Sequence, residues 1–322
     1  MNVLVTGATG FIGSHLVDVL QRQGDDVSAL VRSTRKAQSL VELGVRVIRG
    51  DLDDEPALAL ATRDCQVIYH LAGLVAARNE REFQRTNRDG TRKLVAAAQK
   101  NGRPLFVLVS SLAAGGPALP GRPLRGDEPP RPVSAYGRSK LAGEEVVRQS
   151  DLAYVVVRPP IVYGPRDTEV LKIFIAARRG LVPMCGDGRQ ELSAVYAPDL
   201  AEALAAIAAA PQAVFRTYCA CHAQRFTSEE LVQTVAKALG RRVRILKLSE
   251  RPSRVILGLT ETFCRLIGRR TILTRDKAKE LFQAAWTGDP GPLHRDTRWH
   301  AQHDLASGIA ATAAWYRARG WI

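Results

Sequence analysis

The sequence predicts an α/β fold in which helices cover both faces of a doubly wound parallel sheet. Short apolar runs, typical of strands buried on both faces, alternate over the first 165 residues with segments of helical periodicity. A glycine-rich turn joins the first apolar run to the first helix. A strand, a glycine-rich turn and a helix in this order are typical of a dinucleotide-binding unit, so the predicted fold also indicates a function.

The first unit consists of a strand over residues 3–5, the turn, and a helix over residues 15–23. Gly7 permits the tight turn, Gly10 allows a pyrophosphate to approach the backbone, and Gly13 lets the helix pack on the strand. The phosphates would lie on free N–H groups at the helix N-terminus. The spacing Gly-x-x-Gly-x-x-Gly is a variant of the usual dinucleotide fingerprint and predicts a Rossmann-type sheet.

The second strand, predicted over residues 26–32, bears on the choice of cofactor. In an NAD site an acidic residue at the end of this strand holds the ribose hydroxyls. Here the strand ends at Arg32, and Arg35 and Lys36 follow. These cations favour NADP, whose 2′-phosphate they would contact. The alternative is NAD, held by Asp51 and the backbone.

The third and fourth strands are predicted over residues 45–48 and 67–73. Asp51 follows the third strand and would either accept a hydrogen bond from the adenine amino group or cap a turn. Small residues end the fourth strand, where the backbone would line the cofactor. Beside them, His70 is expected to be a strand residue with satisfied hydrogen bonds and not a catalyst.

The fifth strand, residues 105–109, ends at Ser110 and Ser111. A hydroxyl at the carboxyl end of a parallel strand points into the ligand crevice. The following residues, 113–132, are rich in Gly and Pro and too long for a plain connection, so we expect them to line or cover the site. A sixth strand is predicted over residues 153–158.

The helix predicted over residues 134–150 carries Tyr136 and Lys140 on one face, because they are four positions apart. An ammonium beside a phenol would lower the phenol pKa from its ordinary value of about 10. The pair could then exchange a proton with a substrate oxygen. Alone, such a spacing is typical of an exposed helix face. It becomes evidence for a catalytic pair only together with the elements that precede it.

Taken in order, these motifs resemble those of extended short-chain dehydrogenases/reductases, the NAD(P)-dependent epimerase/dehydratase superfamily. The matching pieces span roughly the first 200 residues and are the 6–13 turn, Gly50-Asp51-Leu52, His70-Leu71-Ala72-Gly73, Asn87, Ser110-Ser111, Tyr136 with Lys140, Arg158-Pro159-Pro160 and Tyr163-Gly164-Pro165.

The resemblance implies a catalytic Ser111, Tyr136 and Lys140, with Asn87 near the nicotinamide ribose. Ser111 is preferred to Ser110 because it lies 25 positions before Tyr136, as the family spacing implies. The residues expected to bind the cofactor are Gly7, Thr9, Gly10, Phe11, Ile12, Gly13, Arg32, Asp51, Leu52, Leu71, Ala72, Gly73, Tyr136, Lys140 and Pro159.

Three classes of function are compatible with this resemblance: a reductase, a sugar-nucleotide epimerase or dehydratase, and a dinucleotide sensor without catalysis. Sensors of this kind typically lack the Tyr/Lys pair. Dehydratases carry acidic residues after the fifth strand, where residues 110–114 contain none. Epimerases usually carry an arginine near Glu191, a carboxylate that would repel a diphosphate, although Arg189 partly offsets it.

The chain is therefore more similar to the dihydroflavonol-reductase and 3β-hydroxysteroid-dehydrogenase-like branch. We expect reversible hydride transfer between a nicotinamide, NADP in preference to NAD, and a ketone or secondary alcohol. The alternative is an NDP-sugar 4-epimerase with tightly bound NAD.

We expect a cofactor domain formed by residues 1–165 and about 195–225, and a smaller α/β substrate domain formed by about 166–194 and 226–322. Residues 254–267 are apolar and punctuated by arginines. They would form either an interfacial amphipathic helix or the wall of a pocket for an apolar carbonyl substrate, and we favour the pocket wall.

The charge is strongly positive, with 46 Lys and Arg against 32 Asp and Glu, a net +14. Nucleic acid or an anionic membrane surface could explain it. Because the arginines are spread along the chain without interleaved aromatics, we favour an Arg-rich composition with anionic ligands and expect no nucleic-acid partner.

The chain is expected to be cytoplasmic, because no apolar run reaches the about 18 residues of a membrane span and no signal peptide precedes the first strand. A homodimer is the expected assembly. The five scattered cysteines suit reduced thiols. Cys219-Ala220-Cys221-His222 lacks a second ligand cluster at zinc-like spacing, so no metal is expected.

Overall fold

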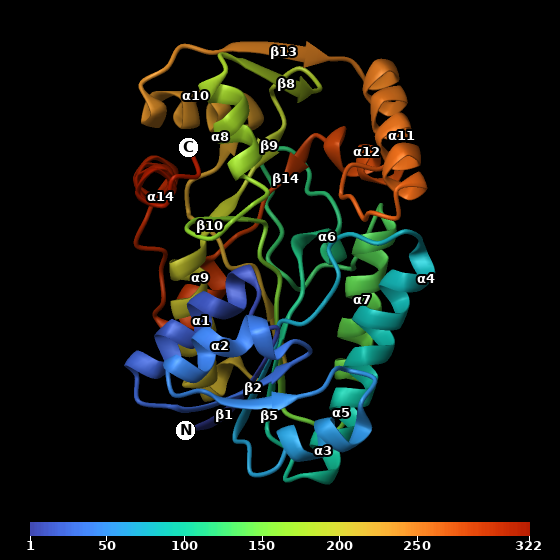
Figure 1. Cartoon of the computed structure of the whole chain (residues 1–322), viewed down its shortest axis with the longest axis vertical. Coiled ribbons are helices and arrows are strands. Elements are labelled where there is room, and N and C mark those ends of the chain that lie inside the picture. The colour runs from blue at the N-terminus through green and yellow to red at the C-terminus, as the bar shows by residue number, and fades with distance from the viewer.

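The centre of the molecule is a parallel sheet of seven strands in the order β11-β6-β5-β4-β1-β2-β3 (Figure 1). The computed structural model describes the backbone of residues 1–322 and the side chains of all but residues 34–36. The order reverses between β1 and β4, the point at which such sheets bind ligands. The strands are β1 (Asn2–Thr6), β2 (Asp26–Val31), β3 (Arg46–Arg49), β4 (Val67–His70), β5 (Leu105–Val109), β6 (Tyr154–Val157) and β11 (Arg216–Tyr218).

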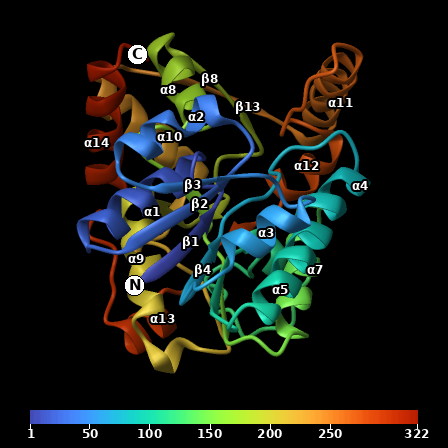
Figure 2. The same ribbon diagram turned by 60° about the horizontal axis from the view of Figure 1, so that its bottom comes forward.

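Helices cover both faces of this sheet, which confirms the predicted doubly wound α/β fold (Figures 1 and 2). Successive residues of β1 face opposite sides of the sheet: Val3 and Val5 belong to one apolar core, and Leu4 belongs to the other. The first core includes α1 (Phe11–Arg22) and α9 (Ala197–Ala208), with α2 (Thr34–Glu42) on the same side, and the second includes α3 (Glu55–Ala61), α5 (Thr91–Lys100) and α7 (Ala135–Arg148).

Three small sheets and a third core lie above the central sheet in Figure 1. β7 (Ile161–Tyr163) pairs with β10 (Ala194–Tyr196), β9 (Glu191–Leu192) lies between β12 (Phe226–Thr227) and β14 (Ala285–Trp286), and β8 (Leu181–Cys185) pairs with β13 (Arg244–Leu248). The helices here are α8 (Leu171–Arg178), α10 (Ser228–Leu239), α11 (Glu250–Leu266), α12 (Arg275–Leu281) and α14 (Leu305–Ala318). The division into a cofactor and a substrate domain stays a prediction.

The helical segment that carries Asn87 begins at Glu80. The chain is helical from α4 (Glu80–Phe83) through a π-helical turn, η1 (Gln84–Gly90), into α5. Asn79 caps the start, its Oδ1 accepting from the Glu82 N–H at 3.0 Å. Asn87 therefore lies inside a π turn, an irregularity frequent at functional sites.

A buried charge cluster around Glu144 fixes α7 to the sheet. Arg158, directly after β6, donates from Nε and Nη2 to the Glu144 carboxylate at 2.9 and 2.7 Å, and Ser110, directly after β5, donates at 2.5 Å. The side chains of Arg158 and Glu144 are 2% and 0% exposed. A buried carboxylate is tolerated only with such partners, so this cluster aligns α7 with the ends of β5 and β6.

Replacing Arg158 with methionine should lower the free energy of unfolding by about 3–5 kcal/mol, because Glu144 would stay buried without its two-pronged partner. The matched control is Arg138→Met, which breaks an exposed pair with Glu80 at 2.8 Å and should cost about 0.2–1 kcal/mol. Urea unfolding measures both. Equal losses would contradict the assignment of the cluster as the anchor of α7.

Candidate active site

The turn between β1 and α1 fits a pyrophosphate. Gly7 has φ +78°, and a Cβ on it would lie 2.8 Å from the Ala72 N atom; a Cβ on Gly13 would lie 2.1 Å from the Gly7 carbonyl oxygen. Only glycine allows β1, the end of β4 and α1 to approach so closely. No side chain caps α1 after Gly10, and its first turn has no acidic residue. Its N–H groups are therefore free to bind phosphate oxygens.

The region expected to hold the adenosine is exposed. Arg32 lies on the surface directly after β2. The side chains of Arg35 and Lys36 lie outside the described residues. The carboxylate of Asp51 accepts from the Asp53 N–H at 2.8 Å and so shapes a turn, while the residue stays exposed and able to contact a ligand.

The other predicted cofactor residues line the same edge of the sheet. Leu52 packs against η1, where a Cβ on Gly90 would lie 2.7 Å from its Cδ1. The Pro159 carbonyl accepts from the Leu112 N–H at 2.9 Å and ties the end of β6 to α6 (Leu112–Gly115). Those at least partly exposed along the turn and after β4 are Thr9, Phe11, Ile12, Leu71, Ala72 and Gly73.

Asn87 holds the loop after β4 in place. Its Oδ1 accepts from the Leu74 N–H at 2.8 Å, and its Nδ2 donates to the Leu74 carbonyl at 3.0 Å and to Ser139 Oγ at 2.9 Å. Because the Asn87 amide makes its hydrogen bonds to Leu74 and Ser139, its role here is to position the loop against α7. A direct role in catalysis stays a prediction.

His70 is a buried structural residue, as expected. Its two ring nitrogens pair with Thr6 Oγ1 at 2.7 Å and Thr91 Oγ1 at 3.0 Å. Burial, with a smaller contribution from the charge of Lys140, lowers the pKa of His70 to about 3. The imidazole is therefore neutral at physiological pH.

The structure brings Ser111, Tyr136 and Lys140 together at the carboxyl end of β5. The Ser111 hydroxyl lies near enough to the Tyr136 phenol to lower its pKa, and it caps α6 by accepting from the Ala113 N–H at 3.2 Å. Lys140 Nζ donates to the Val109 carbonyl at 2.7 Å. The Ser110 hydroxyl points instead to Glu144, which supports the preference for Ser111.

The pKa values of this group differ from expectation in one respect. Burial raises the pKa of Tyr136 to about 12; the Ser111 hydrogen bond lowers it, and the charge of Glu280 raises it. Burial also lowers the pKa of Lys140 to about 8, with the charge of Glu144 acting against it. The expected lowering of the Tyr136 pKa by Lys140 is wrong for this structure, since burial dominates. Tyr136 is a protonated acid at neutral pH.

Two neighbours of Tyr136 were not found from the sequence. The Phe83 ring lies 5.8 Å from the Tyr136 ring, centroid to centroid. The buried carboxylate of Glu280 on α12 is held by the Ser134 hydroxyl and the Lys277 ammonium. Glu280 is far away along the chain, so no local pattern points to it.

The Cys219–His222 stretch serves packing. Both cysteines are buried, and burial raises the pKa of the Cys219 thiol to about 12. His222 Nε2 pairs with the Tyr163 hydroxyl at 2.9 Å. Within the described part of the chain, no three His, Cys, Asp or Glu side chains gather as metal ligands. In the same residues, no helix has both the length and the apolar character to cross a bilayer.

Residues 3–221 match the sequence profile of the NAD dependent epimerase/dehydratase family. The chain belongs to this family. The ceramide reductase of Caulobacter vibrioides is 33% identical over 321 residues, covering 99% of this chain and 96% of the relative. The 2-alkyl-3-oxoalkanoate reductase of Stenotrophomonas maltophilia is 28% identical over 324 residues, covering 96% and 97%.

Solved structures of this epimerase/dehydratase family share the fold over the whole chain. The UDP-glucose 4-epimerase of Thermus thermophilus in complex with NAD is 25% identical and superimposes with a TM-score of 0.78, covering 98% of this chain and 99% of that one. The chain is thus similar both to relatives named as reductases and to relatives named as epimerases. It is an enzyme of this NAD-dependent family.

The depressed pKa of Lys140 gives stability a specific pH dependence. The pKa is about 8 in the folded chain against an ordinary 10.5. Between these values the unfolded chain binds more protons at this site, so unfolding becomes harder as the pH rises. From about pH 7 to about pH 9.5, the wild type should gain about 2 kcal/mol relative to Lys140→Met in urea unfolding. A constant difference would contradict a buried, depressed lysine.

Proposed function

We propose that this chain is an NAD(P)H-dependent reductase that converts a ketone carrying a long apolar chain into a secondary alcohol, reversibly. The observation that carries the proposal is the environment of Tyr136, a half-buried residue whose phenol is protonated and lies beside the Phe83 ring and near the Glu280 carboxylate. Such surroundings suit an uncharged, apolar ketone and provide the proton that its reduction consumes.

The roles of the chain's own groups follow from their positions. The turn after β1 would hold the pyrophosphate of the dinucleotide, whose reduced nicotinamide would supply the hydride for the carbonyl carbon. The Ser111 hydroxyl hydrogen-bonds the carbonyl oxygen, and the Tyr136 phenol transfers its proton to that oxygen. The Lys140 ammonium holds the ribose hydroxyls and stabilises the tyrosinate that remains. Asn87 keeps the neighbouring loop in register.

The substrate class rests on the surroundings of Tyr136 and on the relatives. The ceramide reductase and the 2-alkyl-3-oxoalkanoate reductase are similar to this chain over nearly its full length. Both names refer to molecules with alkyl or acyl chains. A lipid-like ketone of this kind would place its alkyl chain against Phe83.

The alternative is an NDP-sugar 4-epimerase, supported by the similarity to the Thermus thermophilus enzyme. Two carboxylates argue against it. Glu280 adds negative charge near Tyr136, and Glu191 accepts from the Gly121 N–H at 3.0 Å where epimerases usually carry an arginine. Arg189 is exposed nearby in sequence and only partly offsets them.

A Tyr136→Phe variant tests the proton donor. It should lose roughly 10²–10⁴-fold in kcat, the usual contribution of positioned proton transfer, while dinucleotide affinity is kept. NADPH consumption with a ketone that carries a long alkyl chain measures turnover, and fluorescence titration measures cofactor affinity. An unchanged kcat would remove Tyr136 from the mechanism, whereas interconversion of two UDP-hexoses without net cofactor consumption would favour the epimerase.

We further propose that the enzyme prefers NADP, because Arg32 stands where an NAD enzyme carries an acid. The guanidinium would stack on the adenine and bind the 2′-phosphate through its fork of N–H groups. Asp51 and the backbone would support NAD as the lesser cofactor. The cytoplasmic location and a homodimer stay predictions.

The Arg32→Ala variant should weaken NADPH binding by roughly 10- to 150-fold, since a charged hydrogen bond is worth about 1.5–3 kcal/mol. NADH binding should change little. Isothermal titration of both cofactors to both proteins makes the comparison. Equal affinities in the wild type, or equal losses in the variant, would show that Arg32 does not recognise the phosphate.

A further inference from the structure

Helix α11 turns its apolar side toward solvent. Figure 2 shows α11 standing away from the rest of the molecule at the upper right. Ser253, Leu257 and Gly258 are buried, and they mark the side that faces the body. Six apolar side chains share the opposite side and are exposed: Val255, Ile256, Leu259, Phe263, Leu266 and Ile267. Their spacing forms one stripe along the helix.

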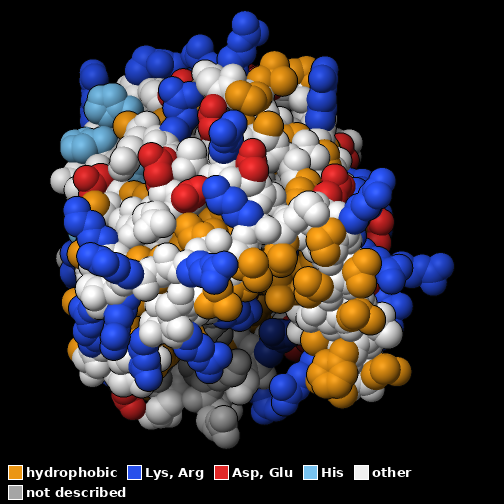
Figure 3. Space-filling model, turned by 90° about the horizontal axis from the view of Figure 1, so that it is seen from above, with side chains coloured by type: hydrophobic (Ala, Val, Ile, Leu, Met, Phe, Trp, Pro, Cys, Tyr) orange, Lys and Arg blue, Asp and Glu red, His pale blue; other side chains and the backbone are white. Residues whose placement is uncertain are grey.

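The stripe is large and continuous. Leu259, Phe263 and Leu266 are 67%, 62% and 81% exposed. The view from above in Figure 3 shows hydrophobic side chains gathered on the right of the molecule, where α11 lies in Figure 1, with Lys and Arg around them. A contiguous apolar patch rimmed by charge is typical of an interaction site.

The charge around α11 is concentrated, contrary to the even spread expected from the sequence. Residues 241–275 hold ten Lys or Arg and two Asp or Glu, so 10 − 2 = +8 of the net +14 lies in this segment. Both acids are paired, Glu250 with Arg254 at 2.6 Å and Glu261 with Arg265 at 3.1 Å. Four of these cations lie on or before β13, and Lys247 and Arg270 pair with Glu229 and Glu82. The positive charge that flanks the stripe comes from the arginines on α11 and directly after it.

We propose that α11 docks on an anionic lipid bilayer, with its apolar stripe in the headgroup region and the surrounding arginines on lipid phosphates. An amphipathic helix with a basic rim binds in this way, lying in the plane of the interface. A second copy of the chain is a poorer occupant, because a symmetric pair through α11 would bring two segments of +8 together. A pocket wall is a poorer role, because the stripe faces away from the body.

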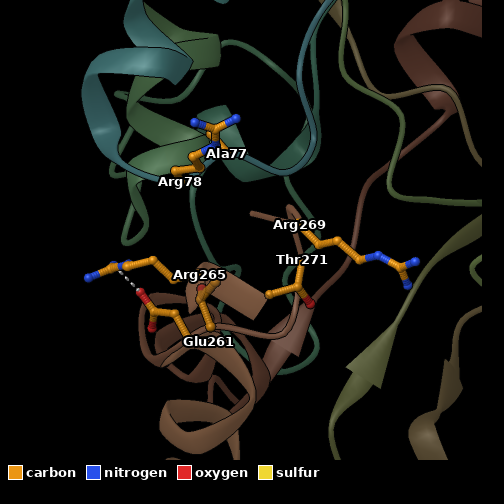
Figure 4. A pocket seen from close by; sticks show the side chains of 7 residues that line it. Ala77, Arg78, Glu261, Arg265, Arg269 and Thr271 are labelled. Carbon is orange, nitrogen blue, oxygen red and sulfur yellow. Dashed lines mark hydrogen bonds and ion pairs between the residues drawn. The ribbon is translucent and has the colours of Figure 1, made fainter. Parts of the chain in front are cut away.

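The position of α11 would bring a bound bilayer close to the active site. The α11–α12 unit contacts the start of α7, where Asp276 accepts from the Ala135 N–H at 2.6 Å, next to Tyr136. A small pocket separates the end of α11 from the loop after β4 (Figure 4). In Figure 4, Ala77 and Arg78 lie on one side of it, and Glu261, Arg265, Arg269 and Thr271 on the other. A docked α11 would bring the α11–α12 unit, and with it the start of α7, close to the membrane surface.

The idea that a docked chain takes a lipid-like ketone from the bilayer rests on the proposed reductase function, whereas docking itself does not. Because vesicle binding needs no substrate, the docking of α11 and the reductase function can be tested independently. A protein that binds vesicles but reduces no ketone would contradict the function alone. A protein that reduces a water-soluble ketone but ignores vesicles would contradict the docking alone.

Vesicle co-sedimentation of the full chain tests the docking. Phosphatidylcholine vesicles with phosphatidylglycerol at about a 3:1 ratio should bind the wild type at least about tenfold more tightly than pure phosphatidylcholine vesicles. The double variant Leu259→Gln/Phe263→Gln should lose at least about tenfold in affinity for the mixed vesicles. Its far-UV circular dichroism and melting temperature should be unchanged, since both side chains are exposed.

The matched control is Leu119→Gln/Phe215→Gln, which removes a leucine and a phenylalanine that are 65% and 64% exposed outside α11. This variant should bind vesicles like the wild type. Equal losses in the two variants, or a wild type that stays in the supernatant, would overturn the proposal. Sedimentation velocity that shows a dimer broken only by the α11 variant, with vesicle binding intact, would assign the face to a second copy instead.

Discussion

The arrangement of the site depends on one buried carboxylate. Glu144 receives two N–H groups from Arg158 and the hydroxyl of Ser110. These partners come from the ends of β6 and β5, so a single charge cluster binds α7 to two strands at once. Because Tyr136 and Lys140 lie on α7 about two turns and one turn before Glu144, the cluster fixes where the phenol and the ammonium lie relative to Ser111. Loss of the cluster would free the helix as well as destabilise the fold.

Burial decides how this constellation behaves chemically. The same removal from water raises the pKa of Tyr136 and lowers that of Lys140. The phenol is thereby kept protonated, and the ammonium is brought close to neutrality without losing its charge at pH 7. A protonated donor suits reduction of a carbonyl.

The sequence predicted what depends on local patterns. The doubly wound parallel sheet, the turn at Gly7 to Gly13, and the placing of Ser111 with Tyr136 follow from periodicity, glycine spacing and family motifs. Contacts between distant segments were out of reach, which is why Glu280 and the cluster around Glu144 were missed. The pKa of Tyr136 was misjudged because spacing reports the neighbouring lysine but not the depth of burial. The exposed side of α11 was missed because an apolar stripe alone does not tell which way it faces.

The central claim is that the site transfers hydride to an external ketone and a proton from Tyr136 to its oxygen. The most direct measurement supplies NADPH that carries deuterium at both positions of nicotinamide C4, together with a ketone that carries a long alkyl chain, and follows the label by mass spectrometry. The account predicts one deuterium on the former carbonyl carbon of each alcohol that the wild type forms, and very little labelled alcohol in the same time with Tyr136→Phe. Retention of all deuterium on the cofactor, while a UDP-hexose is epimerised, would contradict it.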